Sequence, residues 1–159
     1  MDKETFEIPL KCRGIAVVLL KKCNNENKVL LLKRDSTVLQ NVWCYIGGGM
    51  EGNEYAWQAA LREIEEETGI TNVTLYSANK IEQFYSPHTN DIYIAPVFVG
   101  FVDEEQEVTL NHEHSEYKWL SFNEATEYVS LPGNEEVLTF IEKYFVRRQP
   151  MHELLIDIR

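Results

Sequence analysis

Three glutamates are close together in one short segment of the chain. Glu63, Glu66 and Glu67 stand at i, i+3 and i+4, so on an α-helix their carboxylates would share one face, about 6 Å apart. Carboxylate oxygens are the ligands that Mg²⁺ prefers, and Mg²⁺ is usually shared with substrate phosphates. Such a face either binds a divalent cation or is a solvated acidic stripe, and the spacing alone favours neither interpretation.

The helix that would carry these glutamates is expected to begin with Asn53 as its cap, to continue to Thr68 and to stop at Gly69. At 100° per residue, one stripe of this helix is largely apolar and should pack on a sheet. The stripe consists of Trp57, Leu61, Ile64 and Thr68.

The residues around the glutamates favour a functional site. Residues 48–70 read GGMEGNEYAWQAALREIEEETGI. This segment resembles the Nudix box of the Nudix hydrolases, G-x5-E-x7-R-E-U-x-E-E-x-G-U, where U is bulky and aliphatic, and all nine specified positions match. At ordinary residue frequencies a chance match is on the order of one in ten million. The chain is therefore identified as a member of this family, with general similarity to its MutT-like branch.

The resemblance implies a fold and a metal site. The expected fold class is α/β, a Nudix α/β/α sandwich around a mixed β-sheet. The family's ligand positions for Mg²⁺ or Mn²⁺ fall here on Glu63, Glu66, Glu67 and the backbone carbonyl of Gly47. Other matching positions would support the loop and helix of the box and do no chemistry: Gly48, Glu54, Arg62 and Gly69.

Hydrolysis needs a group that accepts the proton of the attacking water. Glu63 is one candidate. Many family members place a further catalytic or metal-binding Glu shortly before a Trp, which points to Glu113 or Glu116, ahead of Trp119. Of these two we favour Glu113, and the choice among the three carboxylates stays open. The neighbouring histidines of the segment 112–114 are expected to be polar loop residues, since neither a Cys nor a third His lies nearby to complete a transition-metal site.

Candidate substrate contacts lie outside the box. Arg34 ends an expected strand, and its guanidinium could bind phosphate oxygens in a bidentate manner. Trp43 and Tyr85 could stack on a nucleotide base, although aromatic residues in strands are more often part of a core.

The rest of the chain predicts one domain over residues 1–159. Strands are expected at 13–20, 28–34, 43–46, 73–85, 92–102 and 116–120, and a last helix at 134–145. The packing of the tail 147–159 is not readable, because its apolar residues 154–158 could add a strand to the chain's own sheet or to the sheet edge of a second copy in a homodimer.

Composition limits the possible partners. With 15 basic and 26 acidic residues the net charge is −11, which argues against a protein that binds nucleic-acid polymers through their phosphates. The longest apolar run, six residues at 15–20, is far too short to span a membrane. The acidic N-terminus lacks the apolar region of a secretory signal, so a cytoplasmic location is expected.

These observations predict a metal-dependent pyrophosphohydrolase that cleaves a nucleoside diphosphate linked to another group. A nucleoside triphosphate, converted to monophosphate and pyrophosphate by a metal-activated water, is the favoured substrate. Nucleotide sugars, ADP-ribose and dinucleoside polyphosphates are alternatives.

Two other interpretations compete with this one. Gly47, Gly49 and Gly52 also satisfy G-x-G-x-x-G, the pattern of a dinucleotide-binding turn, but Glu51 and Glu54 would crowd the helix N-terminus that binds pyrophosphate. A regulatory module that binds nucleotides without hydrolysing them is the second alternative. The complete set of box glutamates favours an enzyme.

Overall fold

The computed structural model describes residues 6–158. Its elements follow one another along the chain as β1 (Leu10–Lys11), β2 (Gly14–Cys23), β3 (Glu26–Arg34), β4 (Trp43–Cys44), β5 (Ile46–Gly49), α1 (Ala56–Thr68), β6 (Thr74–Ser86), β7 (Asp91–Val102), β8 (His114–Leu120), α2 (Phe122–Tyr128) and α3 (Asn134–Ile141). A short π-helix (Glu142–Val146) continues α3, and a 3₁₀ turn (His152–Leu154) follows it.

The strands form a mixed sheet. β2 and β7 pair in parallel near its centre, and β1 extends the parallel part along β7. All other pairings are antiparallel: β2 with β3 and β5, β3 with β4 and β8, and β6 with β7. The sheet therefore brings the glycine-rich β5 and the late strand β8 next to the N-terminal strands.

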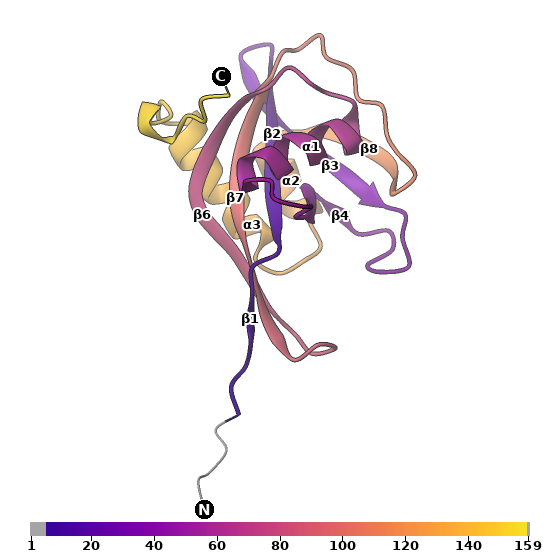
Figure 1. Ribbon diagram of the computed structural model, residues 1–159. Helices are drawn as coiled ribbons and strands as arrows, with labels where there is room; N and C mark the ends of the chain where they lie inside the picture. Colours follow the sequence, from indigo (N-terminus) through magenta and orange to yellow (C-terminus); the bar gives the residue numbers. More distant parts are fainter. Residues whose placement is uncertain (1–5, 159) are drawn as a thin grey trace, which may run out of the picture.

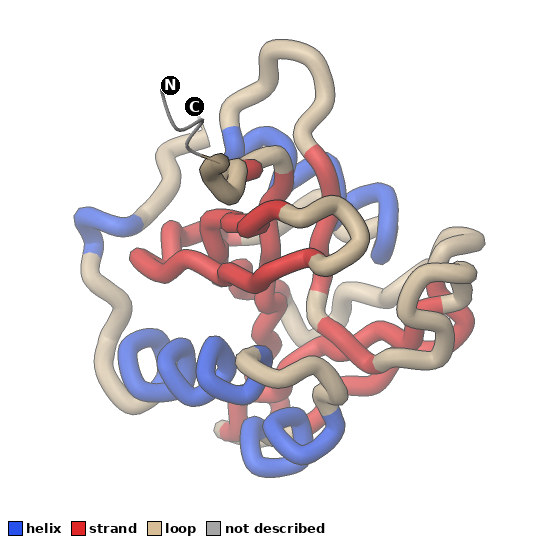
Figure 2. Tube along the Cα trace, turned by 90° about the horizontal axis from the view of Figure 1, so that it is seen from below, coloured by secondary structure: helices blue, strands red, loops and turns tan. Residues whose placement is uncertain are grey.

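Helices cover both faces of this sheet (Figures 1 and 2). Because side chains alternate along a strand, β2 supplies both cores: Ile15, Val17 and Leu19 pack on the α1 side, whereas Ala16, Val18 and Leu20 pack on the side of α2 and α3. Burial on both faces explains why residues 15–20 read as a continuous apolar run. The expected α/β/α sandwich is confirmed.

The element boundaries differ from expectation at several positions. The expected strand 43–46 is divided into β4 and β5 at Tyr45, and the last helix changes to π-helical geometry after Ile141. Helix α2 was not expected at all. Its signal is present in the sequence, because Ser121 and Glu124 form a capping box in which Ser121 Oγ accepts the backbone N–H of Glu124 at 3.2 Å.

The tail returns to its own sheet. Leu155 forms an antiparallel bridge with Tyr76 of β6, and the N–H of Ile156 donates to the carbonyl of Leu75 at 2.9 Å. This bridge joins the tail to the chain's own sheet. Over residues 6–158, no helix is both long and apolar enough to cross a membrane.

Candidate functional site

The box forms a loop followed by helix α1, and the loop sets where the helix begins. Gly52 has a φ of +54°, a left-handed conformation that favours glycine. The helix is capped at Tyr55, whose N–H donates to Gln58 Oε1 at 2.7 Å, so the expectation that Asn53 is the cap was wrong. Glu54, which precedes this cap, accepts hydrogen bonds from Arg62 instead. The expected stop at Gly69 is confirmed, with φ +74° and its N–H donating to the Glu65 carbonyl.

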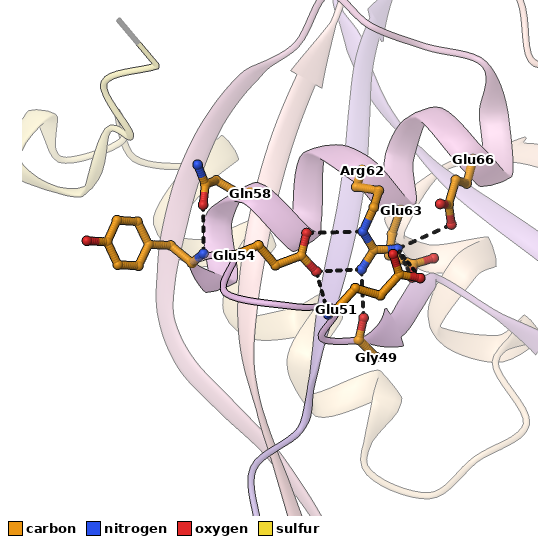
Figure 3. Close-up of polar contacts among 8 residues, drawn as sticks. Gly49, Glu51, Glu54, Gln58, Arg62, Glu63 and Glu66 are labelled. Carbon is orange, nitrogen blue, oxygen red and sulfur yellow. Dashed lines mark hydrogen bonds and ion pairs between the residues drawn. The ribbon is translucent and has the colours of Figure 1, made fainter.

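Arg62 ties this loop to the helix (Figure 3). Its guanidinium donates two hydrogen bonds to Glu54, at 2.7 and 3.1 Å, and one to the carbonyl of Gly49 at 2.7 Å. It also donates to Glu63 at 2.9 Å and to Glu66 at 3.3 Å. Hydrogen bonds to these acids raise the pKa of Arg62 and lower the pKa of Glu54, so both groups stay charged. This geometry supports the bracing role expected for Glu54 and Arg62.

Gly48 leaves the space that Glu63 occupies. A Cβ atom built on Gly48 would lie 2.1 Å from Cδ of Glu63 and 2.6 Å from its Cγ. Gly48 is paired with Ile15 in the sheet, so its backbone cannot simply move away. A residue with a side chain at this position would therefore displace the Glu63 carboxylate. Gly47, the expected carbonyl ligand, lies in the same strand opposite Ala16.

The three box glutamates have different surroundings. Glu63 and Glu67, one turn apart, are buried against the sheet, whereas the side chain of Glu66 is about half exposed. Burial, together with the nearby carboxylates of Glu63 and Glu113, raises the pKa of Glu67 to about 9. Burial also raises the pKa of Glu63, partly offset by Arg62. Two acids held together out of water need a cation to stay ionised.

The start of strand β8 places another acid and a histidine beside Glu63 and Glu67. Glu113, just before β8, and His114, its first residue, each offer a ligand atom within 4.8 Å of one on Glu67. The N–H of Asp35 donates to the Glu113 carbonyl at 2.8 Å, which fixes the segment against the loop after β3. Glu113 therefore lies beside the buried box glutamates, as the sequence favoured.

Glu116, the other candidate base, lies elsewhere. A bulge between Lys33 and Arg34 shifts the register of β3 and β8, so that Arg34 opposes His114 and Lys33 opposes Glu116. Opposed residues of an antiparallel pair point to the same face, and neighbouring residues of a strand point to opposite faces. Glu116 accordingly forms an ion pair with Lys33 at 3.0 Å, away from the box glutamates.

Arg34 faces the acids from β3. Its positive charge offsets part of the rise in the pKa of Glu67, and it adds to the burial that lowers the pKa of His114. Nε donates to the carbonyl of Val38 at 3.2 Å and Nη2 to Ser36 Oγ at 3.3 Å, which hold the guanidinium from the loop side. Over residues 6–158, Arg34 forms no ion pair within 4.0 Å.

The two candidate stacking residues are not beside these acids. Trp43 packs edge-to-face on Tyr128 of α2, at 5.5 Å between ring centroids, with the Lys118 ammonium over its ring. Tyr85 lies near the end of β6 and donates to Asn90 Oδ1 at 2.7 Å, in the β6–β7 hairpin whose tip projects from the sheet (Figure 1).

Sequence reasoning missed the position of His114. His112 is an exposed loop residue as expected, but His114 is buried, at 7 % exposure. Its burial follows from pairing with Arg34, a contact between residues 80 positions apart that no local pattern indicates. Burial lowers the pKa of His114, which keeps the imidazole neutral.

The donor set fits a divalent cation. Among the described residues, two buried side-chain atoms have no hydrogen-bond partner, Glu67 Oε2 and His114 Nδ1, and both residues belong to the cluster that could hold a metal. Buried polar atoms without partners are rare and call for an explanation. A cation between them would satisfy both.

Comparisons with known proteins agree with this geometry. The NUDIX domain model matches residues 13–144. An RNA pyrophosphohydrolase of Pelagibacter ubique is 28 % identical over 145 residues, covering 81 % of this chain and 87 % of that protein. The nucleoside triphosphatase NudI of Escherichia coli O139:H28 is 27 % identical over 113 residues, covering 65 % and 80 %.

A solved structure is also similar. The crystal structure of the MutT protein from Methanosarcina mazei Go1 superimposes with a TM-score of 0.66 at 30 % identity, covering 87 % of this chain and 95 % of that one. The family model spans most of the chain, including the box, strands β2 to β8 and α3. The chain therefore belongs to the NUDIX family, as a MutT-like hydrolase of the pyrophosphatase type.

Proposed function

We propose that this protein is a divalent-cation-dependent pyrophosphohydrolase that converts a nucleoside triphosphate to the monophosphate and pyrophosphate. One observation carries the proposal: the buried carboxylate of Glu67 has an oxygen without a partner, next to other acids. A carboxylate in this position is poorly stable without a cation and suits one that also binds substrate phosphates.

Glu63, Glu66, Glu67 and the carbonyl of Gly47 are the proposed ligands of Mg²⁺ or Mn²⁺. When bound, the cation neutralises phosphate charge and makes a water more acidic. Arg62 fixes the Glu63 carboxylate through the 2.9 Å hydrogen bond, so that this ligand is already oriented.

Arg34 and Glu113 have the remaining proposed roles. Arg34 would bind phosphate oxygens, because its guanidinium faces the acids without an ion pair in the described part of the chain. Glu113 is exposed and close to Glu67, so it is the proposed base. In the reaction the water oxygen bonds to phosphorus, the bridging P–O bond breaks, pyrophosphate leaves, and the water proton passes to Glu113.

The names of two relatives and the net charge of the chain support a nucleoside triphosphate as the substrate. The related NudI is named a nucleoside triphosphatase. A second curated relative is named an RNA pyrophosphohydrolase, and RNA bearing a 5′-triphosphate presents the same linkage. The net charge of −11 weighs against a long polyanion and favours the free nucleotide.

The test is a substrate panel scored by product identity. Nucleoside triphosphates, 5′-triphosphorylated RNA, ADP-ribose, a nucleotide sugar and a dinucleoside polyphosphate are incubated with Mg²⁺ or Mn²⁺, and with a chelator. We expect monophosphate and pyrophosphate from a triphosphate, and no turnover with the chelator. Faster turnover of another compound would replace the substrate, and equal turnover with the chelator would refute the mechanism.

Glu67→Gln should lower kcat at least about 100-fold, because removing a metal ligand removes charge stabilisation of the transition state. Glu65→Gln is the matched control, since Glu65 lies on the exposed side of the same helix. Equal activity of Glu67→Gln and wild type would exclude Glu67 as a ligand.

A further inference from the structure

His114 is a buried side chain beside the proposed metal site that the proposed mechanism does not use. Its side chain is buried at the start of β8, and Nδ1 has no hydrogen-bond partner in residues 6–158. The second buried atom without a partner, Glu67 Oε2, belongs to the same cluster. Both residues can bind a metal ion and belong to the same cluster, so one bound cation would give both atoms a partner.

The distances suit a shared ion. One ring nitrogen of His114 and carboxylate oxygens of Glu67 and Glu113 all lie within 4.8 Å of one another. Two ligand atoms on opposite sides of a first-row ion are separated by about 4.2 Å, and by less at smaller angles. Small side-chain adjustments would therefore let one ion contact both His114 and Glu67.

We propose that the His114 imidazole is a nitrogen ligand of the cation that Glu67 binds, so that the site prefers transition-metal ions such as Mn²⁺ and Co²⁺ to Mg²⁺. Imidazole adds affinity for transition-metal ions, whereas Mg²⁺ strongly prefers oxygen. The inference rests on the proposed function, because it concerns the same metal site. Glu113, the third member of the cluster, keeps its role as the base.

Strand pairing holds His114 in this position. His114 is opposite Arg34 in the β3–β8 register, and the Asp35 N–H bond to the Glu113 carbonyl fixes the residue before it. His112, two residues earlier, lies in the exposed turn and has no such constraint. It therefore provides a matched control on the same segment.

The test is pulsed EPR of the full chain loaded with Mn²⁺ alone. An imidazole ligand produces a ¹⁴N coupling, which should change to a ¹⁵N coupling when the protein is made with ¹⁵N-histidine. We expect this signal in the wild type and in His112→Gln, and its loss in His114→Gln. The wild-type isotope experiment is informative even where His114→Gln fails to fold.

Affinity provides a second readout. Calorimetry should show that His114→Gln weakens Co²⁺ binding at least about tenfold relative to Mg²⁺, whereas His112→Gln leaves the ratio unchanged. Mn²⁺ bound without any histidine nitrogen coupling would overturn this inference and leave the proposed function intact. Absence of divalent-cation uptake altogether would overturn both.

Discussion

Among the single residues of the site, the buried acids determine how protonation and metal binding are coupled. Glu67 is only 2 % exposed, and the side chains near it include two acids, Glu63 and Glu113, as well as the cation Arg34. Without a metal, such a carboxyl has the lowest free energy when it keeps its proton. Metal binding must then displace that proton, which couples both stability and metal affinity to pH.

In the absence of metal, the free energy of unfolding should depend on pH. The pKa of Glu67 is about 9 in the folded protein and near its ordinary value of 4.5 when unfolded. Between these values the native state binds more protons, so the free energy of unfolding should fall as pH rises. The raised pKa of Glu63 acts in the same direction. Urea unfolding with a chelator, at about pH 7 and about pH 8.5, measures the slope.

Glu67→Gln is the comparison, because it removes the titrating group and should flatten this slope. The lowered pKa of His114 has an effect of the opposite sign, but only below its ordinary value of 6.5. Identical slopes in wild type and variant would show that Glu67 ionises normally in the folded protein.

The second prediction tests the space over Gly48. Gly48→Ala places a methyl group where the Glu63 side chain lies, so we expect weaker metal binding by about 10- to 100-fold, as for other disturbed ligand orientations. Calorimetry with Mn²⁺ measures the affinity. Gly49→Ala is the control, since its new Cβ would come no closer than 3.7 Å to the Arg13 carbonyl. Equal losses in both variants would point to a general effect on β5.

At the scale of elements, strand alternation selects the residues of the site. The register of β3 and β8 places Arg34 and His114 on one face and Lys33 and Glu116 on the other. The bulge between Lys33 and Arg34 is the local feature that produces this arrangement. Two glutamates three positions apart consequently have different surroundings.

Substitutions of Glu113 and Glu116 should therefore affect kcat differently. Glu113→Gln should lower kcat by about 10²- to 10⁴-fold, as expected for loss of a general base. Glu116→Gln, which removes only an exposed ion pair with Lys33, should stay within about twofold of wild type. Steady-state kinetics on the same nucleotide measures kcat for both variants. A larger loss in Glu116→Gln would assign the base to β8 instead.

At the scale of the whole molecule, a polar cluster links three parts of the fold on the face opposite α1. Tyr45, between β4 and β5, donates to Glu82 of β6 at 2.5 Å, and its hydroxyl lies 3.1 Å from the amide oxygen of Asn134 at the start of α3. Burial raises the pKa of both Glu82 and Tyr45. A half-buried carboxyl of this kind depends on its donor.

The fourth prediction follows from this cluster. Tyr45→Phe should lower the free energy of unfolding by about 1–3 kcal/mol, because Glu82 loses its buried hydrogen-bond donor. Chemical denaturation measures the change. Tyr76→Phe is the control, expected to cost less than about 0.5 kcal/mol, since the Tyr76 hydroxyl makes no hydrogen bond in the described chain. Equal effects would mean that the Tyr45 bond contributes no stability.

Local sequence patterns were enough to predict the part of the site that one helix carries. Glu63, Arg62 and Glu67 lie within two turns of one helix, and helical geometry alone relates residues that close in sequence. The stop at Gly69 could be predicted because glycine readily adopts the left-handed conformation that ends a helix. Asn53 was wrongly expected to be the cap because the loop contacts of Glu54 and Gln58 set the first turn.

Which distant residues lie beside that helix depends on how the whole sheet pairs. The position of Glu113, the burial of His114 and the approach of Arg34 all depend on the register and bulge of a strand pair separated by about 80 residues. The same pairing places Glu116 beside Lys33, and β4 places Trp43 against Tyr128. Strand register depends on contacts summed over both faces of the sheet, so no short segment encodes it.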